Sequence, residues 1–374
     1  MKIMTVFGTR PEGVKMAPII KAIYKRSDIE QVVCITAQHR EMLDQVIDLF
    51  EIKPDYDLNI FKPGQTLTDI TTNSLKGLED VIKKEKPDIL LVQGDTTTVF
   101  AGALAAFYQK VRIGHVEAGL RSGNLYSPYP EEANRKLTGV LTDFHFAPTN
   151  ANRENLLREG YPEEKIFITG NTVIDALKYA VKKDYIFEDE RLNNIDFENK
   201  RVVLLTSHRR ENLGKSMENI FNAVKDAISL FDDVLVVFPV HLNPRVREIA
   251  NKVFAGSPKV LLTEPLDYAP FTNIMAKAYM AVTDSGGLQE EAPALGKPVL
   301  VVREETERPE GIEAGTAKLV GTHYKDVYDN LVRLLEDNKE YEKMAKAVNP
   351  YGDGTASEKI VDVIVSELNK LGIV

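Results

Sequence analysis

Short apolar runs alternate with longer amphipathic segments along most of the chain. The runs predict strands at residues 3–7, 32–37, 89–92, 112–116, 144–147, 202–206, 234–238, 260–262, 279–283 and 298–302. Between them, apolar residues recur at helical spacing, as at Met42, Val46 and Phe50. Strands that alternate with helices indicate an α/β fold with parallel sheets.

The alternation occurs in two successive stretches of the chain. A length of 374 residues also favours two domains, at about 100–200 residues per domain. We predict a first domain over residues 1–170 and a second over residues 171–354. The charge-dense segment 187–200 is interpreted as the linker between them.

A last amphipathic helix is predicted over residues 355–374. Thr355 and Glu358 have the spacing of a capping box at its start. Its apolar stripe is Ile360, Ile364, Leu368 and Leu371. We expect this helix to cross back onto the first domain.

Composition narrows the classes of protein to which the chain can belong. A net charge of −9 argues against general nucleic-acid binding. A single cysteine, Cys34, cannot form an internal disulfide, which suits a reducing cytoplasm. No apolar stretch approaches the about 18 residues of a membrane span, and the chain opens with a strand rather than a signal peptide. We therefore expect a soluble cytoplasmic protein that binds neither nucleic acid nor membrane.

The segment 279–311 contains the densest group of candidate ligand-binding residues in the sequence. An apolar strand ends at Asp284, and Ser285-Gly286-Gly287 lead into a helix predicted over residues 288–295. Glycines at a helix N-terminus allow a phosphate to approach unpaired N–H groups and the positive end of the dipole. One turn on, Glu290 and Glu291 can accept hydrogen bonds from ribose hydroxyls. The segment thus predicts a nucleotide site, with an ordinary strand, turn and helix as the alternative.

Arginines add to this site. The strand at 298–302 is followed by Arg303 and Arg308, and an arginine here can clamp a diphosphate through paired hydrogen bonds. The strand at 202–206 ends in a histidine flanked by arginines, His208, Arg209 and Arg210, which predicts an anion pocket or a solvated turn. Phe271, in a predicted loop over residues 268–271, is a further candidate contact.

The first strand leads into a helix whose start is marked by Thr9 and Glu12, in the spacing of a capping box. Arg10 and Lys15 lie in or near the first turn, where the helix dipole disfavours positive charge. A bound anion would remove that conflict. Two solvated basic side chains are the alternative interpretation.

Carboxylates follow the next strands of the first domain. Asp95 and Glu117 stand at carboxyl ends of predicted strands, where ligands bind in parallel sheets. Asp95 could instead cap a helix, whereas Glu117 carries no capping signal. His115 precedes Glu117 by two residues and is expected to pack rather than react. The proline-stiffened segment 127–135 adds Glu131 and Arg135 as candidates, or simply begins a helix with acidic residues.

Eight of these motifs, in this order, resemble the non-hydrolysing UDP-N-acetylglucosamine 2-epimerases, and the resemblance spans the chain nearly end to end. They are Gly8-Thr9-Arg10-Pro11-Glu12, Gln38-His39-Arg40-Glu41-Met42, Gly94-Asp95-Thr96-Thr97-Thr98, Gly114-His115-Val116-Glu117-Ala118-Gly119-Leu120-Arg121, Tyr129-Pro130-Glu131-Glu132, His208-Arg209-Arg210-Glu211, Asp284-Ser285-Gly286-Gly287 and Thr306-Glu307-Arg308-Pro309. The sequence departs from the family pattern in three places. Gln93 stands where His is expected, Ser207 stands where Gly or Ala is usual, and Glu304-Glu305 stand where Asp-Thr is common.

The resemblance implies two Rossmann-like domains in a glycosyltransferase-B arrangement, with the active site in the cleft between them, and a homodimer. It implies interconversion of UDP-N-acetylglucosamine and UDP-N-acetylmannosamine, for polysaccharides of the cell envelope, with no metal or added cofactor. The chain accordingly contains neither Gly-x-Gly-x-x-Gly nor a P-loop. The implied catalytic residues are Asp95, Glu117, Glu131 and His208. The implied substrate contacts are Arg10, Lys15, Arg135, Arg209, Phe271, Ser285, Gly286, Gly287, Glu291 and Arg308.

Three other functions use the same ligand. A glycosyltransferase of this fold would need an acceptor and would release UDP permanently. A hydrolysing epimerase would release N-acetylmannosamine and UDP. A UDP-sugar sensor would need only the second-domain site, and the three first-domain carboxylates argue against it.

Overall fold

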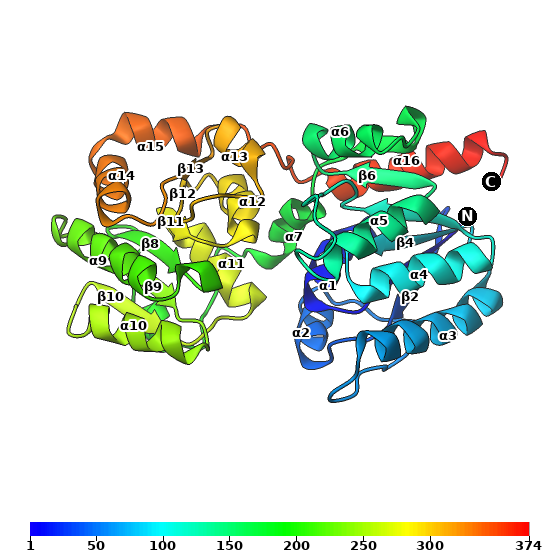
Figure 1. Ribbon diagram of the computed structural model, residues 1–374, viewed down its shortest axis with the longest axis horizontal. Coiled ribbons are helices and arrows are strands. Elements are labelled where there is room, and N and C mark those ends of the chain that lie inside the picture. The colour runs from blue at the N-terminus through cyan, green and yellow to red at the C-terminus, as the bar shows by residue number, and fades with distance from the viewer. Residues whose placement is uncertain (374) are drawn as a thin grey trace. The chain divides into compact units, whose positions relative to one another are not determined.

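The computed structural model describes residues 1–373 and contains two compact units. The first unit is Met1–Tyr179 together with the chain from Tyr351 onward, and the second is Ala180–Pro350. Figure 1 shows that the red C-terminal helix lies among the blue-to-green elements of the first unit. Within the described residues, no helix combines the length and apolar character needed to span a membrane.

The first unit is built on a seven-stranded sheet whose neighbouring strands are all parallel. Its strand order is β3-β2-β1-β4-β5-β6-β7. The strands are β1 (Lys2–Phe7), β2 (Glu30–Ile35), β3 (Tyr56–Asp57), β4 (Ile89–Gln93), β5 (Arg112–Val116), β6 (Phe144–Ala147) and β7 (Ile166–Ile168). The helices are α1 (Arg10–Tyr24), α2 (Glu41–Leu49), α3 (Leu67–Glu85), α4 (Thr97–Tyr108), α5 (Glu131–Leu141), α6 (Asn150–Arg158), α7 (Thr172–Ala180) and α16 (Ala356–Lys370).

The second unit repeats this design on a six-stranded parallel sheet with the order β10-β9-β8-β11-β12-β13. The strands are β8 (Arg201–Thr206), β9 (Val234–Pro239), β10 (Val260–Thr263), β11 (Met280–Thr283), β12 (Val299–Val301) and β13 (Ala317–Leu319). The helices are α8 (Glu190–Asn193), α9 (Lys215–Ser229), α10 (Pro244–Phe254), α11 (Tyr268–Lys277), α12 (Gly286–Ala294), α13 (Pro309–Glu313), α14 (Tyr324–Glu336) and α15 (Asn338–Ala345).

Both sheets have a point where the strand order reverses. It lies between β1 and β4 in the first unit and between β8 and β11 in the second. Loops leaving the carboxyl ends of two such strands diverge to opposite sides and leave room for a ligand. The strand orders therefore point to Gly8–Arg10 and Gly94–Asp95 in one unit, and to Ser207–Arg209 and Asp284–Gly286 in the other.

The segment 187–200 is not a linker, because it lies inside the second unit. Phe187 and Leu192 are buried there, and the Asn193 side chain is hydrogen-bonded to the backbone N–H and carbonyl of Phe187. The sequence pattern misleads because charged residues surround these few apolar anchors. The units divide after Tyr179 rather than after residue 170, since α7 is held to the first unit.

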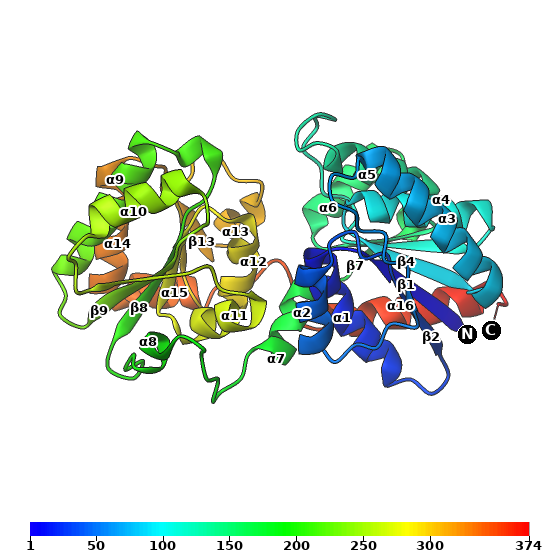
Figure 2. The same cartoon turned by 90° about the horizontal axis from the view of Figure 1, so that it is seen from below.

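Helix α16 packs on α1 of the first unit, as the sequence predicts for the last helix, and Figure 2 shows the two together. Its N-terminus is not held by the predicted box of Thr355 and Glu358. Instead, Asp175 of α7 accepts hydrogen bonds from the backbone N–H groups of Ala356 and Ser357. The Thr355 hydroxyl is bound to Asp353. The cap is thus a long-range contact, which local spacing cannot reveal.

The predicted loop at 268–271 is also helical, since α11 begins at Tyr268. Pro270 falls in the first turn of this helix, where a missing N–H costs nothing. Its proline therefore marks a helix start rather than a loop. Phe271 is half-buried in the same turn.

Candidate active site

Asp284 organises the second-unit site from the end of β11. Its side chain is fully buried and accepts hydrogen bonds from the backbone N–H groups of His208 (2.9 Å) and Arg209 (3.0 Å). The Ser207 hydroxyl and the Asn212 amide also donate to Asp284 Oδ2, at 2.9 and 3.1 Å. Burial alone raises the pKa of Asp284, but hydrogen bonds from His208 and Arg209 outweigh it and leave the pKa below its usual value.

These contacts fix the loop after β8 over the start of α12. His208 Nδ1 lies 3.2 Å from Asp284 Oδ1, and its ring stacks on that of His241 at 5.6 Å. Of the histidine and arginines predicted here, His208 and Arg209 are brought to the strand-end site. Ser207 stands where the family pattern has Gly or Ala, and its hydroxyl donates a hydrogen bond to Asp284.

Helix α12 begins at Gly286, two residues before the predicted start, so both glycines belong to its first turn. Ser285 occupies the N-cap position, and within residues 1–373 its side chain makes no capping hydrogen bond. A Cβ placed on Gly286 would lie 3.9 Å from Arg209 Nη2, and one on Gly287 would lie 3.3 Å from Glu291 Oε1. The N-terminus of α12, with the Arg209 guanidinium beside it, is an environment that favours an anion.

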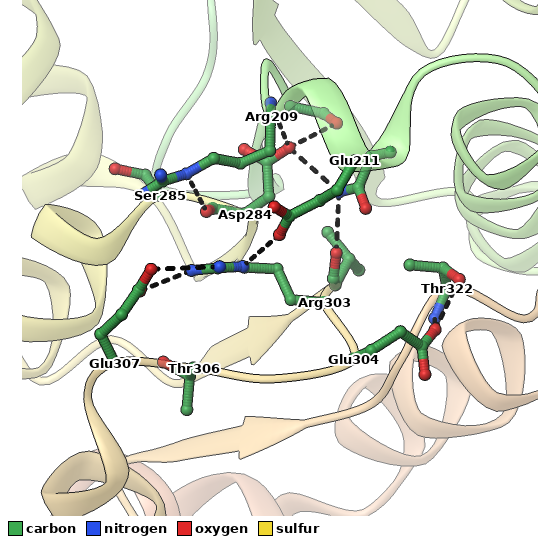
Figure 3. A network of polar contacts seen from close by, with 12 residues as sticks. Arg209, Glu211, Asp284, Ser285, Arg303, Glu304, Thr306, Glu307 and Thr322 are labelled. Carbon is green, nitrogen blue, oxygen red and sulfur yellow. Dashed lines mark hydrogen bonds and ion pairs between the residues drawn. The ribbon is translucent and has the colours of Figure 1, made fainter. Parts of the chain in front are cut away.

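Arg303 links two loops of this site through hydrogen bonds to two glutamates. Figure 3 shows it between Glu211 (Nε to Oε1, 2.8 Å) and Glu307 (Nη1 to Oε2, 2.6 Å). Its side chain is only 8% exposed, so these bonds anchor the loops after β8 and β12 to each other. Glu304, another departure from the family pattern, accepts hydrogen bonds from the backbone and hydroxyl of Thr322. Arg303 and Glu304 therefore support the loops of the site.

Arg308 and Glu291 are the remaining predicted contacts near α12. Arg308 forms a hydrogen-bonded ion pair with the buried Glu290. Glu290 is therefore engaged by an arginine, and Glu291 is the carboxylate of this pair that lies over Gly287. The ion pair fixes the Arg308 guanidinium against α12, the helix that begins with Gly286 and Gly287.

In the first unit, Asp95 is not a helix cap. Thr96 occupies the N-cap of α4, and its hydroxyl accepts a hydrogen bond from Val99 N. The Asp95 carboxylate instead binds Arg135 of α5, whose Nη2 and Nε lie 2.6 and 2.9 Å from Oδ2. The Asn134 side chain also donates to the Asp95 carbonyl at 2.9 Å. This pairing removes the capping alternative for Asp95 and places it beside α5.

Glu117, after β5, has a backbone φ of 64°. This left-handed conformation is unfavourable for a residue with a side chain and is frequent at functional sites. Glu117 Oε1 lies 2.5 Å from Lys15 Nζ and 3.0 Å from Asn171 Nδ2, and Oε2 accepts a hydrogen bond from Gln93. The carboxylate lies beside Gly94, since a Cβ there would be 3.6 Å from Oε2. Glu117 and Asp95 therefore belong to one group of strand-end residues.

The two acidic residues that start α5 have different environments. Glu132 is fully buried and accepts hydrogen bonds from Ser122 N, Gly123 N and Arg135. Glu131 Oε2 is also buried, but within residues 1–373 it has no hydrogen-bond partner. Glu132 thus fixes the loop before α5, and Glu131 is the carboxylate available to a ligand.

Arg10 and Lys15, the two basic residues in the N-terminal half of α1, have different environments. Lys15 is paired with Glu117, whereas Arg10 is half-buried at the first position of the helix. Glu12 accepts hydrogen bonds from Gly8 N and Thr9 N, both at 2.7 Å, and from the Thr96 hydroxyl. Burial raises the pKa of Glu12 to about 7, against the lowering effect of these bonds. Glu12 therefore ties the loop after β1 to the loop after β4.

His115 packs, as predicted from its place in β5. It is 1% exposed, and Nε2 lies 2.7 Å from the Gly94 carbonyl. Burial lowers its pKa to about 4. A neutral ring that is bonded to the backbone supports the loop bearing Asp95.

Several residues that orient the candidate side chains are not predicted from the sequence. The most important are Asp284, which the sequence marks as a strand end and as part of a family motif but not as a site residue, and Asn171. Both are polar residues directly after or near an apolar strand, the same signal that identified Asp95 and Glu117. A polar residue directly after or near an apolar strand of a parallel sheet is therefore a candidate site residue.

Comparison with known proteins agrees with the motifs. The family model described as UDP-N-acetylglucosamine 2-epimerase matches residues 21–365. The UDP-N-acetylglucosamine 2-epimerase of Bacillus subtilis is 55% identical over 98% of this chain and 95% of its own. A crystal structure from Listeria monocytogenes has a TM-score of 0.94 at 51% identity, covering 99% of this chain and 97% of that one. The Neisseria meningitidis enzyme bound to UDP-GlcNAc has a TM-score of 0.85 at 52% identity, covering 98% and 100%.

These matches confirm the predicted α/β class with two Rossmann-like units, because structures of the same fold align over nearly the whole chain. They also confirm the resemblance drawn from the motifs, since the family model extends across both units. The chain therefore belongs to the UDP-N-acetylglucosamine 2-epimerase family.

Proposed function

We propose that this protein epimerises C2 of UDP-N-acetylglucosamine, giving UDP-N-acetylmannosamine without net hydrolysis. The family match supports the reaction class, and the Neisseria meningitidis relative was solved with UDP-GlcNAc bound. The second unit presents an anion site at α12, which suits a diphosphate. The first unit presents carboxylates, which suit proton exchange at carbon.

The proposed reaction removes UDP and then adds it back. The C2 proton has no neighbouring carbonyl, so direct abstraction is difficult. Departure of UDP breaks the C1–O bond, leaves positive charge at C1 and acidifies the C2 proton. A carboxylate takes that proton, and the electron pair forms the double bond of 2-acetamidoglucal. A proton returned to the opposite face of C2 and attack by UDP oxygen at C1 complete the epimer.

Each step needs groups that the chain supplies. The N–H groups at Gly286 and Gly287, with Arg10, His208 and Arg308, would stabilise the departing diphosphate. Lys15, Arg135, Arg209, Phe271, Ser285 and Glu291 are the further substrate contacts that we propose. Asp95, Glu117 and Glu131 would exchange the C2 protons.

The observation that carries the proposal is the grouping of three carboxylates at the ends of β4 and β5 and the start of α5. Asp95 is bound to Arg135 of α5, and Glu117 lies beside Gly94. Glu131 is the first residue of α5, with a buried oxygen that no protein group in residues 1–373 occupies. A UDP-sugar sensor needs no groups for proton exchange, so these three carboxylates argue against that alternative.

The deciding experiment is incubation of the protein with UDP-N-acetylglucosamine alone in D2O, followed by NMR. We expect UDP-N-acetylmannosamine with deuterium at C2, because the abstracted proton exchanges while the glucal is bound. Free N-acetylmannosamine would identify a hydrolysing enzyme. Turnover only after an acceptor is added would identify a glycosyltransferase, and binding without turnover a sensor. Retention of the original hydrogen would indicate hydride transfer.

Asp95→Asn tests the role of the carboxylates. Since Thr96 already caps α4, this change leaves the cap intact. We expect UDP binding to persist and turnover to fall by about 100- to 10,000-fold, the usual contribution of a general acid or base. Asp80→Asn, at an exposed position of α3, is the matched control and should leave turnover unchanged. Near-normal turnover in Asp95→Asn would leave the proton chemistry to Glu117 and Glu131.

We also propose that the enzyme is a homodimer in the cytoplasm. The family resemblance supports the dimer, and the buried unpaired thiol of Cys34 suits a reducing compartment. Burial raises the pKa of Cys34 to about 12, so it stays an unreactive thiol. Light scattering after size-exclusion chromatography should give twice the mass of one chain, and a monomer would contradict the dimer.

A further inference from the structure

The Glu117 carboxylate is held by side chains from three distant parts of the first unit. Lys15 comes from α1, Gln93 ends β4, and Asn171 directly precedes α7. Gln93 and Asn171 are 2% and 3% exposed, so water does not compete freely for their amides. Two amides that cannot titrate therefore fix one carboxylate on both of its oxygens.

Asn171 makes a different contact with each of its polar groups. Its Oδ1 accepts a hydrogen bond from Val173 N at 3.1 Å, which caps the start of α7. Its backbone N–H donates to the Tyr351 carbonyl at 2.7 Å. Its Nδ2 donates to Glu117 Oε1 at 3.0 Å. One residue thus joins a helix cap, the segment around Tyr351 and a proposed catalytic carboxylate.

The segment around Tyr351 is where the chain returns to the first unit. Here Gly170, with φ 90°, and Gly352, with φ 128°, pass so closely that no Cβ fits easily between them. A Cβ on Gly170 would lie 3.2 Å from the Tyr351 carbonyl oxygen and 3.3 Å from Gly352 Cα. The returning chain is therefore held directly against the residue before Asn171.

We propose that Asn171 is a positioning residue for Glu117, which couples the orientation of this carboxylate to the chain crossing at Tyr351. The inference rests on the proposed function, in which Glu117 exchanges a proton at C2. The left-handed backbone of Glu117 gives its side chain an unusual direction, and the amide of Asn171 holds the carboxylate there. A shift of the crossing moves Asn171 N, and with it the donor that Glu117 requires.

Substitution can separate the two roles of the Asn171 side chain, which caps α7 and donates a hydrogen bond to Glu117. Asn171→Asp keeps an acceptor for Val173 N, and Asp caps helices as well as Asn does. It replaces the donor to Glu117 with a second carboxylate, and like charges disfavour the ionised pair. Asn171→Ser also caps, but it is too short to replace the amide and adds no charge. Lys15 and Gln93, which also contact Glu117, stay in place in both variants, as does His115, which interacts electrostatically with Glu117.

The experiment measures kcat, KM and UDP affinity across pH for the wild type and both variants. In Asn171→Asp we expect unchanged UDP affinity, a fall in kcat of at least about 10-fold, and an acid limb of kcat moved up by about one pH unit or more. In Asn171→Ser we expect a similar fall with a smaller shift of the limb. Asp175→Asn is the control, because it weakens the cap of α16 without touching Glu117. It should lower stability and leave the acid limb in place.

Two results would overturn the inference. Wild-type kcat and acid limb in both Asn171 variants would show that Asn171 serves only as a cap. An equal displacement of the limb in Asp175→Asn would show that the effect is not specific to the contact with Glu117. A wild type that leaves UDP-N-acetylglucosamine unchanged would instead refute the proposed function, so the two failures are distinguishable.

Discussion

Replacement of Asp284 by Asn tests whether one buried carboxylate builds the second-unit site. Asp284 accepts hydrogen bonds from the Ser207 hydroxyl, His208 N, Arg209 N and the Asn212 amide. The variant keeps the shape and one oxygen but loses the charge. The loop after β8 should therefore remain in place while becoming easier to open.

The magnitude follows from the bonds themselves. A hydrogen bond to a charged group contributes about 1.5–3 kcal/mol, against about 0.5–1.5 kcal/mol for a neutral one. Loss of the charge costs about 1–1.5 kcal/mol for each of the four hydrogen bonds, or about 4–6 kcal/mol together. Burying a neutral amide in place of a carboxylate recovers part of this. We expect a net loss of about 2–4 kcal/mol in the free energy of opening this loop.

Hydrogen exchange of the His208 and Arg209 amides is the direct assay, because both donate to Asp284. Exchange should accelerate by about 30- to 1,000-fold at neutral pH, since each 1.4 kcal/mol is about tenfold. The pKa of Asp284 lies below its usual value, so the stabilisation is present above the ordinary range of an Asp and is lost as pH falls through the folded pKa. The difference between wild type and variant should thus shrink in acid.

Asp232→Asn, at an exposed position in the same unit, is the control. It should leave exchange at His208 and Arg209 unchanged. If Asp284→Asn accelerates exchange by less than about twofold, the carboxylate does not hold the loop, and the reasoning from charge-assisted bonds fails.

The remaining predictions concern pH, ligand affinity and backbone geometry. The pKa of Glu12 is raised from 4.5 to about 7 in the folded protein. Its contribution to the free energy of unfolding is therefore full below pH 4.5 and is lost as pH rises through 7. In urea unfolding, wild type should lose about 3 kcal/mol relative to Glu12→Gln between about pH 4 and about pH 8. A constant difference would contradict the shift. Arg10→Ala and Arg308→Ala should each weaken UDP binding in calorimetry by about 1.5–3 kcal/mol, and unchanged affinity in both would remove them from the diphosphate site. A Cβ on Gly119 would lie 2.3 Å from the Asn152 carbonyl oxygen, so Gly119→Ala should destabilise by more than about 2 kcal/mol in urea. Gly64→Ala, which also has positive φ but open space around it, should cost only about 1 kcal/mol.

Local pattern was sufficient to predict the longer strands and several residues at their ends, but not the short strands β3, β7 and β13. The strands at 112–116 and 144–147 coincide with β5 and β6, because a continuous apolar run leaves little freedom in its limits. Asp95, Glu117 and His208 were found because a parallel sheet gathers the residues at its carboxyl edge. The position of a residue along a strand is a local property, and the sequence reports it directly.

Partners of these residues were not predictable in the same way. Lys15 was interpreted as part of an anion site, and it binds Glu117, which is 102 residues away. Asp175 caps α16 from 181 residues away, where a local box of Thr355 and Glu358 had been expected. Ion pairs and caps form wherever the chain brings opposite partners together, so spacing alone cannot distinguish a local partner from a distant one.

The order of the chain also determines when each unit can be completed during synthesis. The second unit is continuous, so all of its residues have been made before the last helix appears. The first unit must wait for α16, because the apolar face of that helix, with Ile360, Ile364 and Leu368, is buried in it. A nascent chain therefore carries all of the second unit while the first is still incomplete, and the uncovered surface of the first unit is open to aggregation or chaperones until α16 has been made.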